Sequence, residues 1–147
     1  MWGSEGDKSE TIKQTVPWDE FRSTDTAQKF PAITQEGQAV FRWAVFEMAK
    51  VAQQALDAAG ITPDDLDVFI PHQANMRIID SMVKTLKLPE HVTVARDVET
   101  TGNTSAASIP LAMERLLATG AAKSGDTALV IGFGAGLVYA ATVVTLP

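Results

Sequence analysis

The hydrophobic and polar positions of residues 38–59 repeat with the period of an α-helix. Polar side chains recur three and four positions apart, and the positions between them are mainly apolar, which predicts a helix with a narrow solvated stripe. Gly60 is a natural end for this helix, because glycine readily adopts the left-handed conformation that terminates helices. The stripe consists of Glu47, Lys50, Gln54 and Asp57.

Residues 67–70 form a short apolar run that is typical of a strand covered on both faces, and residues 92–95 predict a second strand. Between them, apolar positions at helical spacing predict a second helix. Asn75 is a suitable N-cap for that helix, because its side-chain oxygen can accept a hydrogen bond from a free N–H of the first turn. The helix is expected to end near Pro89.

Residues 104–119 predict a third helix that ends at Gly120, and Pro110 marks either a late start or a kink in it. Residues 127–132 and 137–146 predict two strands joined by FGAG. A connection this short cannot be a parallel crossover, so the pair should form an antiparallel hairpin. The element order predicts an α/β fold with a mostly parallel, helix-covered sheet and one antiparallel member.

The first 37 residues show no sustained period and are expected to form an irregular leader with short elements at most. Residues 38–147 are expected to form the structured domain. The chain has 147 residues, 46% of them hydrophobic, and a net charge of −6, which argues against a nucleic-acid-binding surface. No apolar run approaches the roughly 18 residues of a membrane span, and no signal-peptide pattern is present, so a cytoplasmic protein is the default expectation.

Candidate metal chemistry is poorly supported by the composition. The chain has no cysteine and only two histidines, His72 and His91, which lie far apart in the sequence. His91 has the surroundings of a surface residue in a helix-to-strand loop. Disulfides, thiolate metal sites and a cysteine nucleophile from this chain are excluded.

His72 follows a predicted buried strand, at the position where α/β proteins commonly present ligand-binding groups. Pro71 fixes the direction in which the chain leaves the strand and is not expected to continue the sheet's hydrogen bonds. A structural histidine that caps the next helix is an equally good interpretation of this position alone.

Asn103 lies in a second loop between a strand and a helix, and Gly102 before it permits a tight turn. The loop is either an ordinary one, with Thr104, Ser105 and Ser108 as candidate helix caps, or a second strand end that delivers an amide donor beside His72. GFGAG at residues 132–136 lacks the helix that a dinucleotide-binding loop requires, so it is interpreted as a strand-to-strand turn.

Three motifs are more specific together than singly. PHQAN at 71–75, GNTSAASIP at 102–110 and GFGAG at 132–136 closely resemble, in this order, the C-terminal half of β-ketoacyl-acyl carrier protein synthase III, a condensing enzyme of the thiolase fold. The resemblance runs from about residue 37 to residue 147, and more loosely through the irregular leader. It implies the C-terminal half of a thiolase-like fold.

The resemblance also implies a Cys-His-Asn active site without a cofactor. In this family a cysteine takes an acyl group from acyl-CoA; malonyl-acyl carrier protein then binds to the His and Asn, loses carbon dioxide and attacks the acyl-enzyme. On this sequence these residues are His72 and Asn103. Such a site needs hydrogen-bond donors directed at the enolate oxygen that decarboxylation creates.

Other site residues are implied by their positions in the motifs. Backbone amides and the site wall would come from Phe133, Gly134 and Ala135, the last of which often is a glycine in the family. The pantetheine channel would be lined by Phe41, Ala74, Asn75 and Ile78. The basic patch that docks the acyl carrier protein would comprise Arg77, Lys84 and Arg42.

Because the chain lacks the nucleophilic cysteine, we expect it to be an inactive fragment of an enzyme that initiates fatty-acid synthesis. An N-terminal half bearing the cysteine would be its partner, the complete enzyme would be a homodimer, and the chain alone should expose apolar surface. Two alternatives remain: a polyketide-priming synthase or acyltransferase of secondary metabolism, and a scaffold half without catalytic activity.

Overall fold

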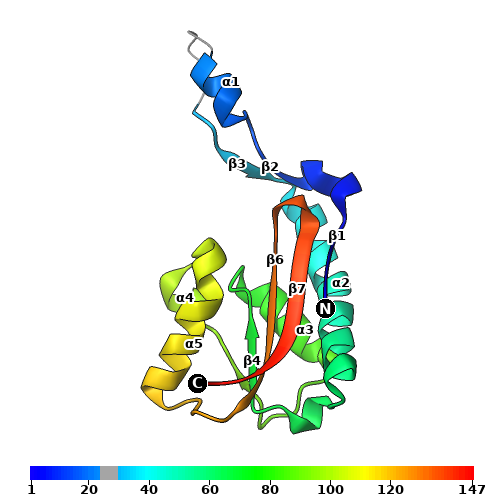
Figure 1. The fold of residues 1–147 in the computed structure, drawn as a ribbon, viewed down its shortest axis with the longest axis vertical. Helices are drawn as coiled ribbons and strands as arrows, with labels where there is room; N and C mark the ends of the chain where they lie inside the picture. Colours follow the sequence, from blue (N-terminus) through cyan, green and yellow to red (C-terminus); the bar gives the residue numbers. More distant parts are fainter. Residues whose placement is uncertain (24–29) are drawn as a thin grey trace.

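The described residues before position 37 form only short elements, whereas the long helices and strands lie in the rest of the chain (Figure 1). The structure is a computed structural model and describes residues 1–23 and 30–147. The leader contains β1 (Trp2–Ser4), the 3-10 helix η1 (Gly6–Thr11), β2 (Ile12–Gln14), α1 (Trp18–Ser23) and β3 (Ile33–Gln35). After it come α2 (Gly37–Ala59), η2 (Pro63–Asp65), β4 (Val68–Pro71), α3 (Met76–Leu86), β5 (Thr93–Val94), α4 (Val98–Thr101), η3 (Ser105–Ala107), α5 (Ser108–Thr119), β6 (Thr127–Gly134), η4 (Ala135–Leu137) and β7 (Val138–Thr145).

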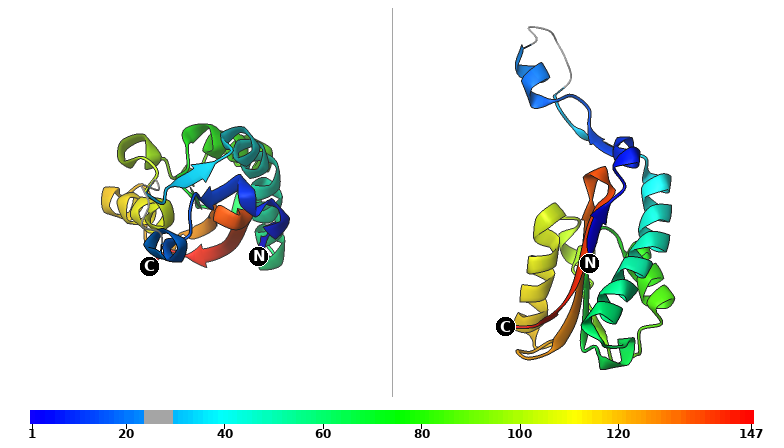
Figure 2. Two further views of the ribbon diagram at one scale, coloured as in Figure 1. Left: turned by 90° about the horizontal axis from the view of Figure 1, so that it is seen from above. Right: turned by 45° about the vertical axis from the view of Figure 1, so that its right-hand side comes forward.

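Five strands form one sheet in the order β1-β7-β6-β4-β5. Strands β4, β5 and β6 are parallel to one another, and β6 and β7 form the predicted antiparallel hairpin. Figure 2 shows the sheet edge-on, with α2 and α3 on one face and α5 on the other. The predicted α/β architecture is therefore confirmed.

The apolar strands are buried on both faces because successive side chains point in opposite directions. Phe69 of β4 packs in the cluster that contains residues of α2 and α3, whereas its neighbours Val68 and Ile70 pack in the cluster beneath α5. All three side chains are fully buried. This explains why the strand has a continuous apolar run rather than an alternating pattern.

The predicted helix ends are confirmed at two places. Helix α2 stops at Gly60, which has φ 70° and donates its N–H to the carbonyl oxygens of Leu56 and Asp57. Asn75 caps α3, and its side-chain oxygen accepts a 3.0 Å hydrogen bond from the N–H of Ile78. Both caps use backbone groups that a helix terminus otherwise leaves unpaired.

Other details differ from the expectations. Pro71 lies within β4 and pairs with Ile131 in the parallel register, so the strand runs one residue further than predicted. Helix α5 begins at Ser108, so Pro110 stands in its first turn and marks a late start rather than a kink. Ser108 is the first residue of α5 and Ala107 holds the N-cap position, so Ser108 is not the cap, and its hydroxyl is bonded to groups outside the helix.

The leader contributes to the sheet, which the sequence pattern does not indicate. Strand β1 pairs antiparallel with β7, so the sheet has two antiparallel pairs instead of one. Strands β2 and β3 form a separate two-stranded sheet that extends from one end of the body towards α1 (Figure 1). Among the described residues, no helix is both long and apolar enough to cross a membrane.

Candidate active site

A cavity of about 980 Å³ lies where the leader meets the ends of the central strands. Its walls come from β2 and β3, the start of α2, the β4–α3 loop, the segment before α5, and the β6–β7 turn. The lining is mainly apolar. It includes every residue that we expected to act as catalyst, oxyanion-hole element or channel wall: Phe41, His72, Ala74, Asn75, Ile78, Asn103, Phe133, Gly134 and Ala135.

His72 leaves the end of β4 with its backbone still bound to the sheet. Its N–H donates a 2.7 Å hydrogen bond to the carbonyl oxygen of Ile131. Its Nδ1 lies 2.6 Å from Ser108 Oγ, and its ring makes an edge contact with Phe133, with ring centroids 5.2 Å apart. Burial lowers the pKa of the His72 imidazole, because a partly desolvated ring disfavours its charged form, so the ring is neutral at neutral pH.

Asn103 is exposed and is oriented by a local hydrogen bond. Its side-chain oxygen accepts a 2.9 Å hydrogen bond from the N–H of Ser105, so the amide NH₂ is the group left for a ligand. Gly102 before it has φ 70°, and Ser105 has φ 54°, which is unusual for a residue with a side chain. Strain of this kind is frequent at functional sites.

Gln73, the residue after His72, is fully buried and connects three segments. Its Nε2 donates to the carbonyl oxygens of Pro71 (2.8 Å) and Ala95 (3.2 Å), and its Oε1 accepts from the N–H of Val98 (3.1 Å). The side chain therefore links the β4 end to the beginning of the segment that leads to Asn103. Its role is not apparent from the sequence, in which it is one polar residue of a loop.

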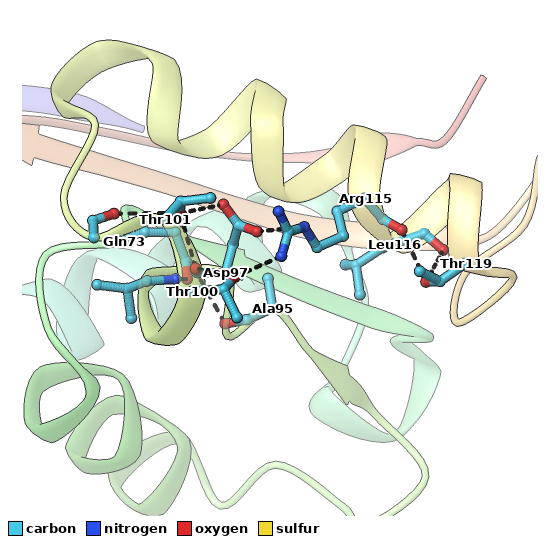
Figure 3. A network of polar contacts seen from close by, with 10 residues as sticks. Gln73, Ala95, Asp97, Thr100, Thr101, Arg115, Leu116 and Thr119 are labelled. Carbon is cyan, nitrogen blue, oxygen red and sulfur yellow. Dashed lines mark hydrogen bonds and ion pairs between the residues drawn. The ribbon is translucent and has the colours of Figure 1, made fainter.

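Asp97 continues this connection towards α5 (Figure 3). Its carboxylate is 2.7 Å from Nε of Arg115 and accepts a 2.6 Å hydrogen bond from the Thr101 hydroxyl. The side chain of Asp97 is only 3% exposed, whereas that of Arg115 is 46% exposed. The ion pair holds α4, and with it the turn before Asn103, against α5.

The glycine turn forms the part of the cavity wall beside His72. Gly136 has φ 72°, which permits the tight connection through η4. Phe133 stands between two aromatic rings, because it contacts His72 on one side and Trp43 on the other. Ala135 is exposed and lines the cavity with Phe133 and Gly134.

The three expected docking residues are exposed but do not line the cavity. The Arg77 guanidinium lies 4.9 Å from the centroid of the Phe41 ring, a cation–π contact that places it beside a cavity wall. Lys84 lies two turns further along α3. Arg42 lines a separate, smaller hollow of about 320 Å³ with residues of η1.

The described residues contain no group of three or more His, Cys, Asp or Glu side chains that could hold a metal ion. The polar groups of the cavity at the ends of the central strands include an imidazole, a primary amide and the backbone N–H groups of the glycine turn. These three are neutral donors, and Lys13 of β2 adds a cationic side chain to the lining. Such a set suits the stabilisation of a negatively charged oxygen.

The fold is the C-terminal half of a thiolase-like fold, which two solved structures share. Residues 56–146 match the family described as 3-oxoacyl-[acyl-carrier-protein (ACP)] synthase III C terminal. The chain belongs to this family.

Two relatives in Streptomyces are similar over the whole chain. The β-ketoacyl-[acyl-carrier-protein] synthase III 1 of Streptomyces coelicolor is 85% identical, with 100% of this chain and 46% of the relative covered. The β-ketoacyl-[acyl-carrier-protein] synthase III of Streptomyces glaucescens is 86% identical, with 100% and 44% covered. The chain thus spans less than half the length of these relatives.

Two crystal structures share the fold. The priming β-ketosynthase of the R1128 polyketide biosynthetic pathway superposes with a TM-score of 0.93 at 46% identity, over 99% of this chain and 43% of that one. The 3-oxoacyl-(acyl carrier protein) synthase III of Pseudomonas aeruginosa gives a TM-score of 0.84 at 32% identity, over 100% and 43%. Because these matches cover almost the whole chain, they include the leader with its strand β1.

Proposed function

We propose that this chain supplies the enolate-stabilising part of the active site of a β-ketoacyl-acyl carrier protein synthase III, which condenses acyl-CoA with malonyl-acyl carrier protein to give 3-oxoacyl-acyl carrier protein. The observation that carries the proposal is the convergence of a neutral imidazole and an oriented amide, His72 and Asn103, on one cavity. No cofactor is needed for this reaction.

His72 and Asn103 donate hydrogen bonds to the thioester carbonyl oxygen of the malonyl group. When the carbon–carbon bond to the carboxylate breaks, carbon dioxide leaves and the bonding electrons form an enolate whose charge resides on that oxygen. Fixed donors stabilise this charge more than they stabilise the neutral carbonyl, and loss of one such donor costs about 10²–10³ in rate. A neutral His72 suits this role because it offers an N–H without surrendering a proton.

The enolate carbon then attacks an acyl-enzyme thioester. Backbone N–H groups of the glycine turn, with Ala135 as the principal donor, stabilise the tetrahedral oxyanion, and a cysteine thiolate leaves. Since the sequence contains no cysteine, that nucleophile belongs to residues outside these 147. An N-terminal half with the cysteine is the partner that this mechanism requires, within a cytoplasmic homodimer.

Substrate delivery uses the remaining residues. The pantetheine arm passes between Phe41, Ala74 and Ile78, which are cavity walls, and Asn75, whose oxygen caps α3. Arg77, Lys84 and Arg42 form the basic contacts for the acidic carrier protein on a chain whose own net charge is −6. Arg77 lies at the cavity edge through its contact with Phe41.

The test is to co-express this chain with the complementary N-terminal part of the Streptomyces coelicolor relative and to assay two half-reactions. His72→Ala and Asn103→Ala are each expected to reduce malonyl decarboxylation about 10²–10³-fold while cysteine acylation by acyl-CoA is retained. Ser124→Ala, an exposed serine away from the cavity, is the control. Normal decarboxylation by either cavity variant contradicts the assigned roles.

A second candidate is the priming reaction of polyketide synthesis, which the similarity to the R1128 priming β-ketosynthase favours. The two candidates share the decarboxylation and differ in acyl primer and carrier protein. Profiling the co-expressed enzyme with several acyl-CoA primers and with carrier proteins of both pathways separates them. If no pair of substrates is condensed, the scaffold alternative replaces both.

A further inference from the structure

The contact between His72 and Ser108 determines which imidazole nitrogen carries the proton. Ser108 is the first residue of α5 and is 1% exposed. Its Oγ lies 2.6 Å from His72 Nδ1 and accepts a 3.2 Å hydrogen bond from the N–H of Gln73. The hydroxyl is therefore enclosed between two consecutive residues of the β4–α3 loop.

A serine hydroxyl has one hydrogen to donate and two lone pairs that accept. The Gln73 N–H uses one lone pair. In residues 1–23 and 30–147, His72 Nδ1 is the one partner atom that can take the hydroxyl hydrogen. If Nδ1 carried a proton itself, the serine would accept twice and its own hydrogen would be buried without an acceptor, which is unfavourable.

We propose that Ser108 is a positioning residue that donates its hydroxyl hydrogen to His72 Nδ1 and thereby keeps the imidazole proton on Nε2. Nε2 has no partner in the described part of the chain and is the ring atom left for a ligand in the cavity. The importance of this tautomer rests on the proposed function, because the malonyl thioester oxygen then meets an N–H rather than a lone pair. The tautomer itself does not depend on that function.

This assignment differs from a purely structural role for Ser108. A hydroxyl that only stabilised the start of α5 would bond to a backbone group of that helix, whereas the hydrogen-bond partners of Ser108 Oγ in the described residues are His72 and Gln73. Its two bonds instead reach the loop that follows β4. The same hydroxyl thus fixes the loop backbone at Gln73 and the ring of His72.

The chain suits a direct measurement because it has only two histidines. In the complete 147-residue chain labelled with ¹⁵N-histidine, correlation of each ring nitrogen with its carbon-bound protons reports the tautomer at pH 8. We expect His72 to have an unprotonated Nδ1 and a protonated Nε2. His91, whose Nε2 lies 3.1 Å from the Leu66 carbonyl oxygen, serves as the internal reference for folding.

Ser108→Ala is expected to raise the population of the Nδ1–H tautomer of His72 relative to the Nε2–H tautomer by about fivefold, the effect of one net hydrogen bond. Ser108→Thr keeps the hydroxyl and is expected to keep the wild-type ratio. Ser124→Ala, at an exposed position, should change neither histidine. In the co-expressed enzyme, Ser108→Ala should slow malonyl decarboxylation and leave cysteine acylation unchanged.

A proton on Nδ1 of wild-type His72, or equal populations of both tautomers, overturns the proposal without any variant. An unchanged ratio in Ser108→Ala with intact His91 signals also overturns it, as does an alanine-like ratio in Ser108→Thr. If the tautomer behaves as expected but His72→Ala decarboxylates normally, the proposed function fails and the tautomer assignment stands.

Discussion

The two donors of the cavity are held in different ways. His72 continues a strand in the middle of the sheet, and its backbone N–H still bonds to Ile131 of the neighbouring strand. Asn103 is exposed and follows a four-residue helix and a glycine with φ 70°. The sheet itself fixes His72, whereas Asn103 depends on side-chain contacts that hold its loop.

Those contacts hold α4, the short helix that precedes Asn103, from two other segments. Gln73 holds the start of α4 through the N–H of Val98, and Asp97 holds it to Arg115 of α5. A donor on a strand is held by the sheet, whereas a donor on a loop needs additional side-chain contacts to keep its position. Substitutions of Gln73 or Asp97, which brace the loop, should therefore displace Asn103 more than His72.

The largest effect is expected from Gln73→Leu, which keeps the side-chain volume but removes the brace. It leaves the Val98 N–H without its acceptor and two carbonyl oxygens without a donor. Each buried group without a partner costs about 1–3 kcal/mol, so we expect the free energy of unfolding to fall by roughly 3 kcal/mol or more. Urea denaturation of the chain measures this.

Gln54→Leu is the matched control for this substitution, because Gln54 is exposed on α2. Surface changes of this type usually stay within about 0.5 kcal/mol. Equal midpoints for the two variants would show that Gln73 is not a brace. In the co-expressed enzyme, Gln73→Leu should reduce decarboxylation more than cysteine acylation.

Gly102→Ala is expected to have the next largest effect. Gly102 has φ 70° and ψ −168°, a combination that is accessible essentially only to glycine, and open space surrounds the position of an added Cβ. The cost is therefore conformational and amounts to about 1–3 kcal/mol. Gly6→Ala is the control, since its position is equally open and its φ lies outside the left-handed region. Urea unfolding midpoints of the two variants are the measurement. A similar small change in both midpoints would argue against backbone strain at Gly102.

The main elements of the fold are predictable because their patterns are long and local. Helix α2 has 23 residues of clear period, and the β6–β7 hairpin is required by its short connection. Strand β1 is not predictable in this way, because it has only three residues and its partner is more than 130 positions away. Strand β4 can include Pro71 because the parallel pairing with Ile131 does not require the N–H that proline lacks.

The motif residues of the site are also predictable, whereas their supports are not. A pattern of residue types does not tell that Gln73 is buried or that Asp97 pairs with Arg115. Ser108 has the sequence position of a helix cap, yet its hydroxyl bonds to residues 35 and 36 positions away. Contacts of this range depend on how α5 packs against the end of β4, which only the folded chain defines.

The smallest expected effect concerns pH and tests the burial of His72. Burial lowers the folded-state pKa of His72 below the usual value of about 6.5. As the pH falls through 6.5 the unfolded chain therefore binds a proton before the folded chain does, and the free energy of unfolding falls with it. The loss of unfolding free energy levels off below the folded-state pKa of His72. Above pH 7.5 His72 does not make the free energy of unfolding depend on pH.

His72→Gln removes this titration and should flatten that part of the pH dependence of stability. The measurement is the urea midpoint of wild type and variant between pH 5 and pH 8, and the difference between the two curves isolates His72. Because Asn103 carries no titratable group, Asn103→Ala should keep the wild-type pH dependence even if its overall stability changes. Curves for wild type and His72→Gln that remain parallel down to pH 5 would mean that the imidazole is as hydrated in the folded chain as in the unfolded one, and the description of His72 as the buried donor of the pair would then be wrong.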